Sequence, residues 1–357
     1  MSSPIDWGVA RRRSAALATP GPRAEKAEVM ALVAQLRAAA ARAPEHVARI
    51  TGLDEAAEVA ADFPVYVVDR PRWAEANIAM FAHLVGDLLP ASSSRAGPRL
   101  AGEELGIVLA LLSSRVLGQF DPFTPMPPRP GEGLAPQPGR LLLVAPNVLR
   151  TEGQLGAASE DFRLWVCLHE QTHAVQFAAA PWLRDHLASR MRHLVTGITA
   201  AEQGKDRLLR GVRAVLDTLR PGEATDADAT MPGLLDAVLD ESERADMAEL
   251  VAVMSLLEGH ADVVMDEVGP AVLPSVRRIR RAFEKRRDGT GMLDILLRRL
   301  LGMDAKIAQY RTGAAFVRGV IDIVGHDGLA AVWHGPLNLP TPEEIATPRA
   351  WVRRIHG

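Results

Sequence analysis

Two histidines four residues apart, His169 and His173, occur in the segment HEQTH, and a glutamate, Glu170, follows the first of them directly. Residues i and i+4 of an α-helix lie about 40° apart around its axis, so both imidazoles would share one face and could bind one tetrahedral zinc ion. Glu170 would point to the side of that face, where a carboxylate can take a proton from a zinc-bound water. The spacing therefore predicts a hydrolytic zinc centre with Glu170 as general base. The plainer alternative is two ordinary histidines of a surface or core helix.

A catalytic zinc ion usually takes three protein ligands, so a third residue should complete the set. Cys167 is the one cysteine of the chain and precedes His169 by two residues, which turns it away from the ligand face and makes it a small core residue. A third histidine at the short HExxHxxGxxH spacing is absent, because Gln176 and Ala179 occupy the places of its glycine and last histidine. The third ligand should therefore be a histidine or carboxylate further along the chain.

An acidic pair, Glu258 and Asp262, lies in a later segment, LLEGHADVVMD, that is apolar nearly all round if helical. Two buried carboxylates are costly unless a cation or hydrogen bonds neutralise them. They are again i and i+4, so Glu258 could bind zinc while Asp262 accepts a hydrogen bond from the second nitrogen of a ligand imidazole. His260 is the alternative third ligand, but it lies about 200° around the helix from Glu258, so the two would not face one ion together. We favour Glu258, which leaves His260 as a hydrogen-bonded core histidine or a donor to substrate.

Amide hydrolysis also benefits from a donor near the developing oxyanion, and three residues are candidates. Tyr310 shares a predicted helix face with Lys306 and with Gly313, where another backbone could approach closely. Tyr310 or Lys306 could enter the active site; otherwise they are a hydrogen-bonded core tyrosine and a lysine whose stem lies along the surface. His334, in the segment VWHGPLN, is a weaker candidate.

Apolar periodicity, interrupted by glycine and proline, predicts the helices that would carry these residues. The HExxH helix should have Ser159 as its N-cap, Glu160 and Asp161 in its first turn, and Pro181 as its stop. Pro44 should interrupt the first long helix. By residue number, the predicted helices cover 23–49, 73–89, 100–117, 159–180, 181–219, 242–268, 274–287, 292–300 and 303–324.

Proline and glycine crowd the segment 121–140, which holds seven prolines and three glycines. This composition excludes a regular helix or a central strand, so we expect a linker or an active-site flap. Short strands are predicted at 65–68 and 141–144. An exposed edge of the second strand could pair with an extended substrate backbone.

The composition limits the class of protein. The chain has 357 residues, of which 48% are hydrophobic and 4% aromatic, and this favours helices packed around a substantial core. The formal net charge is −3, which gives no reason to expect a nucleic acid or an anionic membrane as partner. Seven basic residues between Arg277 and Arg287 are interpreted as a solvated helix face, with docking of an anionic partner or an acidic substrate group as the alternative.

The chain has no segment typical of secretion or of a membrane span. The basic residues near its start are followed by prolines rather than by an apolar stretch, and the longest apolar run, 105–117, is too short to cross a bilayer. We expect a cytoplasmic protein and leave its oligomeric state open.

The HExxH of His169 to His173, with the later ExxxD of Glu258 to Asp262, resembles the gluzincin group of zinc metallopeptidases. That resemblance implies that two histidines and one glutamate bind zinc and that the HExxH glutamate activates water. More narrowly, several segments resemble a family of zincin-like actinobacterial hydrolases associated with deazaflavin coenzyme biosynthesis. This narrower resemblance covers about the last 200 residues and, more loosely, the first third, and it implies a zincin fold and hydrolase activity without naming a substrate. The segments that carry it are HEQTHAVQF, PWLRDHL, LLEGHADVVMDEVG, GMDAKIAQYRTGAAFV, NLPTPEEIATPRAWVRRI and, near the start, VYVVDRPRW.

These observations predict a mainly α protein with a small β component and a zincin-like architecture. We divide it into an N-terminal helical layer (1–120), a proline-rich linker or flap (121–140) and a catalytic region (141–357). The predicted activity is zinc-dependent hydrolysis of a peptide or amide bond, in which Glu170 takes a proton from zinc-bound water and later delivers it to the leaving amine. Two alternatives stay open: a zinc protein that binds a peptide or partner, or uses the metal for structure, without turnover, and a hydrolase of a small non-peptide substrate.

Overall fold

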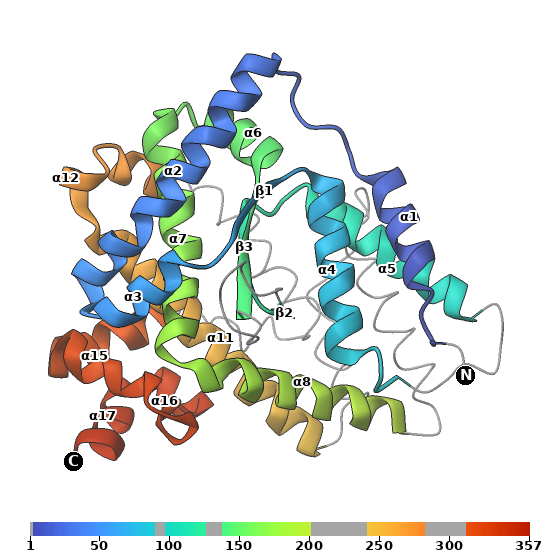
Figure 1. Cartoon of the computed structure of the whole chain (residues 1–357). Helices are drawn as coiled ribbons and strands as arrows, with labels where there is room; N and C mark the ends of the chain where they lie inside the picture. Colours follow the sequence, from blue (N-terminus) through green and yellow to red (C-terminus); the bar gives the residue numbers. More distant parts are fainter. Residues whose placement is uncertain (1–2, 90–96, 126–137, 201–240, 283–311) are drawn as a thin grey trace, which may run out of the picture.

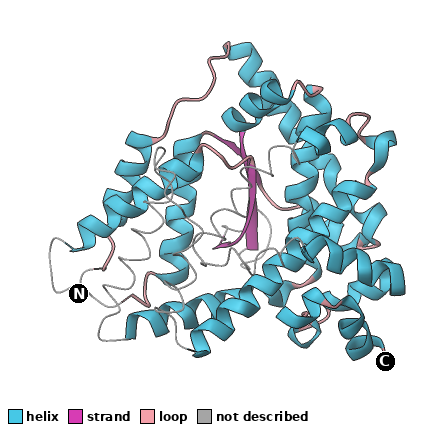
Figure 2. Cartoon of the chain, turned by 180° about the vertical axis from the view of Figure 1, so that it is seen from behind, coloured by secondary structure: helices cyan, strands magenta, loops and turns pink. Residues whose placement is uncertain are grey.

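The computed structural model describes residues 3–89, 97–125, 138–200, 241–282 and 312–357. Helices account for most of these residues and surround one small sheet, as Figure 1 and Figure 2 show from opposite sides. The predicted fold class, mainly α with a small β component, is confirmed. The described elements are, in order, α1 (Trp7–Leu17), α2 (Lys26–Thr51), α3 (Asp54–Ala61), β1 (Val65–Val68), α4 (Arg70–Val85), α5 (Gly97–Ser113), β2 (Gly118–Pro125), β3 (Pro138–Val144), α6 (Ala145–Leu155), α7 (Ser159–Ala179), α8 (Pro181–Ala200), α11 (Glu241–Glu267), α12 (Gly269–Val272), α15 (Thr312–Leu329), the 3-10 helices η2 (Ala330–Trp333) and η3 (Pro336–Asn338), α16 (Pro342–Ala346) and α17 (Pro348–His356).

The sheet has the strand order β1-β3-β2, with β3 parallel to β1 and antiparallel to β2. Side chains of β3 alternate between its two faces. Leu141 and Leu143 enter a core shared with α2 and α7, whereas Leu142 and Val144 enter a core shared with α4 and α5. The sheet is therefore a middle layer with helices on both faces (Figure 1), which explains why the part of β3 between the two cores, residues 141–144, is apolar throughout.

Two expectations for the proline-rich region are wrong. Strand β2 continues through Asp121 to Pro125, and β3 begins at Pro138, so both ends of the segment 121–140 are strand; residues 126–137 lie outside the described part of the chain. Prolines fit there because β2 is an edge strand with an irregular register between Asp121 and Pro125, and because Pro138 is the first residue of its strand. The strand 141–144 is central rather than an exposed edge, so β2 takes the edge position.

Pro44 does not interrupt α2, contrary to the prediction. A proline has no N–H to donate to the carbonyl four residues earlier, which here is that of Ala40. The side chain of Gln171 in α7 supplies the missing donor, because its Nε2 donates to Ala40 O at 3.1 Å. This hydrogen bond satisfies the carbonyl and ties α2 to the helix that carries the HExxH motif.

Helices α7 and α11 lie at the junction of the apolar cores. α7 packs between α2 and the sheet, in the core that contains Leu141. α11 contributes Val264 and Met265 to the same core, and Leu256 and Leu257 to a second core formed with α8, α15 and the C-terminal helices. Within the described residues, no helix combines the length and the apolar composition needed to span a membrane.

The HExxH helix has nearly the predicted bounds, but the N-cap differs. Ala158 occupies that position without a side-chain cap, and Ser159 is the first helical residue. Glu160 and Asp161 lie in the first turn as predicted, and the helix ends at Ala179, before the proline that begins α8. The helix predicted at 274–287 is helical at 276–282 and begins with a turn at 274–275. Residues 283–287 lie outside the described residues, as does the helix predicted at 292–300.

Candidate metal centre

His169 and His173 share one face of α7, and Glu258 faces them from α11. The two helices are in contact, and Figure 1 labels both. The Nε2 atoms of the two histidines are 3.3 Å apart. Glu258 places Oε2 at 3.6 Å from Nε2 of His169 and Oε1 at 3.6 Å from Nε2 of His173. The structure thus brings the predicted ligand set together. Among the described residues, it is the one group of three or more His, Cys, Asp or Glu side chains placed to hold a common ion.

These separations suit a tetrahedral zinc ion. Two ligand atoms that each lie about 2.1 Å from a tetrahedral zinc are about 3.4 Å from each other, and the three separations in the protein are 3.3, 3.6 and 3.6 Å. Two imidazoles and one carboxylate are also a ligand set that zinc accepts while its fourth position stays open for water or substrate. The donor geometry and chemistry therefore fit the ion, and zinc binding by these three residues stays a prediction.

The electrostatics of the two helices also favour ligation. Burial lowers the pKa of His169, and the neighbouring His173 acts in the same direction, whereas the charges of Glu258 and Asp262 oppose this shift. His169 is consequently held neutral near pH 7, as a ligand imidazole must be. Glu258 adds a carboxylate to the two imidazoles of the candidate ligand set.

Glu170 lies against the edge strand β2. Its carboxylate accepts a hydrogen bond from the backbone N–H of Phe120. It lies so close to Gly118 that a Cβ added there would be 2.6 Å from Cγ and 2.9 Å from Oε1 of Glu170. Only 7% of Glu170 is exposed, and burial raises its pKa to about 8, with the charge of Glu258 adding to the shift and the Phe120 N–H opposing it. The carboxyl group is thus fixed beside the three candidate ligands, on the side predicted for a general base.

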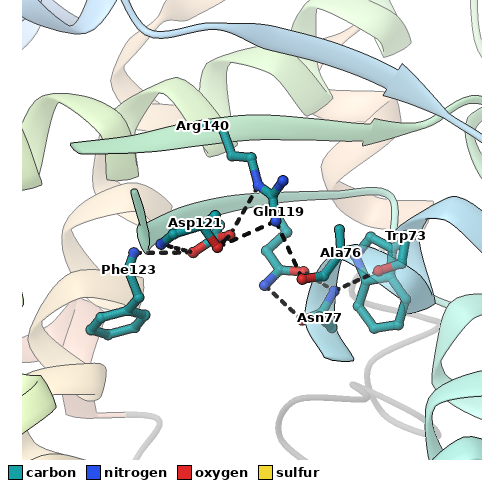
Figure 3. Close-up of polar contacts among 8 residues, drawn as sticks. Trp73, Ala76, Asn77, Gln119, Asp121, Phe123 and Arg140 are labelled. Carbon is teal, nitrogen blue, oxygen red and sulfur yellow. Dashed lines mark hydrogen bonds and ion pairs between the residues drawn. The ribbon is translucent and has the colours of Figure 1, made fainter. Parts of the chain in front are cut away.

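A polar network holds β2 from its other face (Figure 3). Asp121, 1% exposed, accepts hydrogen bonds from the backbone N–H of Phe123 at 3.0 Å and from Nε of Arg140 at 3.1 Å. Gln119 and Asn77 of α4 exchange two amide hydrogen bonds of 3.0 Å each. These contacts anchor the strand to β3 and α4, so Gly118 and the Phe120 N–H have a fixed position opposite Glu170.

His260, the alternative ligand, does not join the group. It is 1% exposed, and its ring contacts Trp333 edge to face at a centroid separation of 5.5 Å. Its Nδ1 lies 3.0 Å from Nε2 of Gln176, whose Oε1 is 2.8 Å from Nδ1 of His173. Burial lowers the pKa of His260 to about 3, with His326 and His173 acting in the same direction. His260 is therefore a neutral, hydrogen-bonded core histidine one side chain away from the candidate centre.

Asp262 lies near His169, and its negative charge opposes the lowering of the pKa of His169 that burial causes. It also forms an ion pair with Arg280, at 3.2 Å between Oδ1 and Nη1, and Arg280 makes a second ion pair of 2.6 Å with Asp266. The proposed hydrogen bond from a ligand imidazole to Asp262 stays a prediction. Arg280 belongs to the basic run 277–287. Its positive charge is balanced by Asp262 and Asp266, which both lie in α11.

The remaining residues considered for the site lie away from the candidate ligands or outside the described residues. Tyr310 and Lys306 lie outside the described residues, so their place in the site stays a prediction. His334 is exposed on the surface after η2. Cys167 is fully buried in the core next to α2, as expected for a small core residue, and burial raises the pKa of its thiol.

A pocket of about 360 Å³ lies between residues that follow α3, in β2 and at the end of α7, and its lining includes three phenylalanines and the charged Asp62 and Arg184. Phe120 and Phe177 line it with ring centroids 5.7 Å apart, and Phe63 lies 5.2 Å from Phe120. The backbone of Phe120 is the donor to Glu170, and Phe177 follows His173 by about one helical turn. The pocket is thus positioned to receive an apolar group bound next to the site.

Sequence reasoning missed three residues of this site: Gly118, Phe120 and Gln176. The first two act through backbone position, and no motif identifies an edge strand that begins only a few residues before a proline-rich segment. The sequence did contain a signal for Gln176. It lies three positions after His173 among apolar residues, and a buried amide needs hydrogen-bond partners.

Two comparisons with known proteins found a match. The family model of zincin-like metallopeptidases matches residues 5–352. The chain is 30% identical to a protein from Chloroflexus aurantiacus whose crystal structure is described as that of a provisionally assigned hydrolase with a novel fold. The TM-score is 0.65, and 98% of each chain is covered. No curated protein matches the chain. The association with deazaflavin coenzyme biosynthesis stays a prediction.

The family match and the structural neighbour both extend over nearly the whole chain. The match therefore includes α7 and α11, which carry the two histidines and the glutamate. On this evidence the chain belongs to the zincin-like metallopeptidase family.

Proposed function

We propose that this protein is a zinc-dependent hydrolase of peptide or amide bonds. The observation that carries the proposal is the convergence of His169, His173 and Glu258 at separations that suit a tetrahedral ion. Glu170 is fixed beside them by a hydrogen bond from the Phe120 N–H. A structural zinc site closes its coordination with a fourth protein ligand. The described residues supply three ligands with a carboxylate next to them, which is the composition of a hydrolytic site.

When bound, zinc supplies a Lewis acid that polarises the substrate carbonyl and makes an attacking water more acidic. Glu170 takes the proton of that water on its free carboxylate oxygen, while the Phe120 N–H holds the carboxylate in place. Glu170 then returns the proton to the leaving amine. His169 and His173 hold the site through Nε2, and Glu258 balances its charge from α11.

The substrate is proposed to lie along β2 and to place an apolar side chain in the aromatic pocket lined by Phe120 and Phe177. β2 is an edge strand that pairs with β3 alone among the described strands, and an extended chain can add to such an edge. Peptides with a large apolar side chain next to the cleaved bond should therefore be preferred.

The test is Glu170→Gln, which keeps an acceptor for the Phe120 N–H and removes the base. The variant should bind zinc as the wild type does and lose about 10²–10⁴-fold in hydrolysis of a peptide or amide library. Equal activity of variant and wild type would contradict the role of Glu170. Zinc binding by the wild type without turnover on any peptide or amide would favour a zinc protein that binds a partner, and turnover only on small non-peptide esters or amides would favour the third alternative.

A further inference from the structure

The side chain of Gln176 lies fully buried between α7 and α11. Its Oε1 is 2.8 Å from Nδ1 of His173, and its Nε2 is 2.9 Å from the carbonyl oxygen of Leu257 and 3.0 Å from Nδ1 of His260. One amide thus contacts a candidate ligand on its own helix and, on the partner helix, the residue directly before Glu258. It is the shortest polar connection between the two ligand-bearing helices among the hydrogen bonds described.

These partners allow only one orientation of the amide. The carbonyl of Leu257 can accept but not donate a hydrogen bond, so the amide nitrogen must face it and Oε1 must face His173. Oε1 can only accept, so Nδ1 of His173 must carry a proton. In the neutral ring, Nε2 of His173 then keeps its lone pair, and this is the atom that lies 3.6 Å from Glu258 and 3.3 Å from Nε2 of His169.

His260 completes the arrangement. The second proton of the amide nitrogen points to Nδ1 of His260, so this nitrogen must be an acceptor and the ring must carry its proton on Nε2. The ring is held against Trp333 and is 1% exposed. His260 therefore secures the amide that faces His173, although it contacts no candidate ligand atom itself.

We propose that Gln176 is a positioning residue that holds His173 in its Nδ1–H form, with Nε2 free for the metal, and that His260 fixes the orientation of Gln176. The inference rests on the proposed function, because it assigns His173 as a ligand. Partners of this kind orient ligand imidazoles and are worth about 10–100-fold in metal affinity.

The same helix offers a matched control. Gln171 is also a buried glutamine of α7, 1% exposed, and its Nε2 donates to a single backbone carbonyl, that of Ala40, at 3.1 Å. It faces α2, and its described hydrogen bond does not involve His173. Gln171→Leu and Gln176→Leu each remove one buried amide from α7, so both should lower thermal stability, but only the second should alter the metal centre.

The first measurement is the zinc dissociation constant, obtained by competition with a chromophoric chelator. Gln176→Leu should bind zinc about 10–100-fold more weakly than the wild type, while Gln171→Leu should bind it nearly as tightly as the wild type. An equal loss in both variants, or no loss in either, would overturn the inference. Failure of the wild type itself to bind zinc would instead contradict the proposed function.

The second measurement reads the tautomer directly, in zinc-free protein labelled with ¹⁵N in its histidines. The imidazole signals of His173, assigned by their absence from His173→Ala, should show the proton on Nδ1 in the wild type. Gln176→Glu keeps an acceptor opposite Nδ1, and its carboxyl group, when protonated in this buried position, can still donate to the Leu257 carbonyl, so it should retain this form, whereas Gln176→Leu should lose it. A His173 tautomer that is the same in all three proteins, or that is lost in Gln176→Glu as well, would contradict the assignment.

Discussion

At the scale of single residues, the chemistry-bearing side chains were predictable and their surroundings were not. His169, Glu170 and His173 follow from helical spacing. Glu258 was chosen from the cost of burying a carboxylate, and this premise is wrong, because the side chains of Glu258 and Asp262 are 39% and 26% exposed. Gly118 could not be identified in this way, because its importance comes from what a side chain would displace. A Cβ at this position would be 2.6 Å from Cγ of Glu170.

Gly118→Ala should therefore push the Glu170 carboxylate away from its place beside the candidate ligands. A displacement of about 1 Å in a catalytic group can cost about 100-fold in rate, so we expect a loss of this order in kcat/KM. Zinc stoichiometry should not change, because Gly118 touches none of the three candidate ligands in the described contacts. Wild-type activity in Gly118→Ala, measured beside its zinc content, would show that Glu170 needs no such constraint.

At the scale of elements, helix positions could be predicted from periodicity, whereas the role of proline could not. Pro44 was expected to end a helix, but a donor from another helix, Gln171, satisfies the carbonyl that proline leaves free. The prolines of 121–140 were expected to exclude a central strand, but the central strand β3 begins at Pro138, because the first residue of a strand tolerates a proline. Both errors have one cause: a local rule was applied where a tertiary partner or the first position of a strand removes its penalty.

The crossing of α11 and α15 depends on two glycines. A Cβ at Gly259 would be 2.2 Å from the carbonyl carbon of Gly313, and one at Gly313 would be 2.2 Å from the carbonyl oxygen of Ser255. The expectation that Gly313 allows a close backbone approach is thus confirmed. Gly259 directly follows Glu258, so the same crossing sets the position of the candidate ligand.

Gly259→Ala should force the two helices apart, lowering the free energy of unfolding by about 1–3 kcal/mol and weakening zinc binding by moving Glu258. The measurements are urea unfolding and the zinc dissociation constant. Gly153→Ala in α6 is the control, because a Cβ there meets no heavy atom within 4 Å and alanine favours a helix. Unchanged stability and zinc affinity in Gly259→Ala would contradict the close crossing.

At the scale of the whole molecule, one core joins helices from both ends of the described chain. α2 from the first third and α11 from the last third both pack with α7 around Leu141 and Leu143. The sequence could not predict this arrangement, because α7 begins more than 100 residues after α2 and ends about 60 residues before α11, and no local pattern records their pairing. The division at 121 and 141 stays a prediction, while the shared core links the first third to the helix that carries the site.

The C-terminal helices make one contribution to stability that depends on pH. Burial would raise the pKa of Glu344, but hydrogen bonds from Arg354 and from the Thr341 N–H, with the charge of Arg354, hold it below its ordinary value. Arg354 binds both carboxylate oxygens at 2.7 Å and is 37% exposed. A carboxylate whose pKa is lower in the folded state stabilises the protein above its unfolded pKa, and this stabilisation is lost as pH falls through the folded value.

Glu344→Gln should lower the free energy of unfolding at pH 7 by about 1 kcal/mol, discounted for the solvent around Arg354. The difference from the wild type should shrink as pH falls from the ordinary glutamate pKa, about 4.3, through the lower pKa of the folded state, where the wild-type carboxylate becomes protonated. Urea unfolding at several pH values measures it, with the exposed neighbour Glu343→Gln as control. A difference that stays constant with pH, or that appears equally in Glu343→Gln, would contradict the ion pair.

The zinc content of the purified wild type beside that of His173→Ala, each loaded with zinc and dialysed, tests the central claim most directly. The account predicts about one zinc per wild-type chain and a loss of most of it in His173→Ala, because one of three protein ligands is removed. A wild type that cannot be loaded with zinc, or a His173→Ala protein that retains the same content, would contradict it.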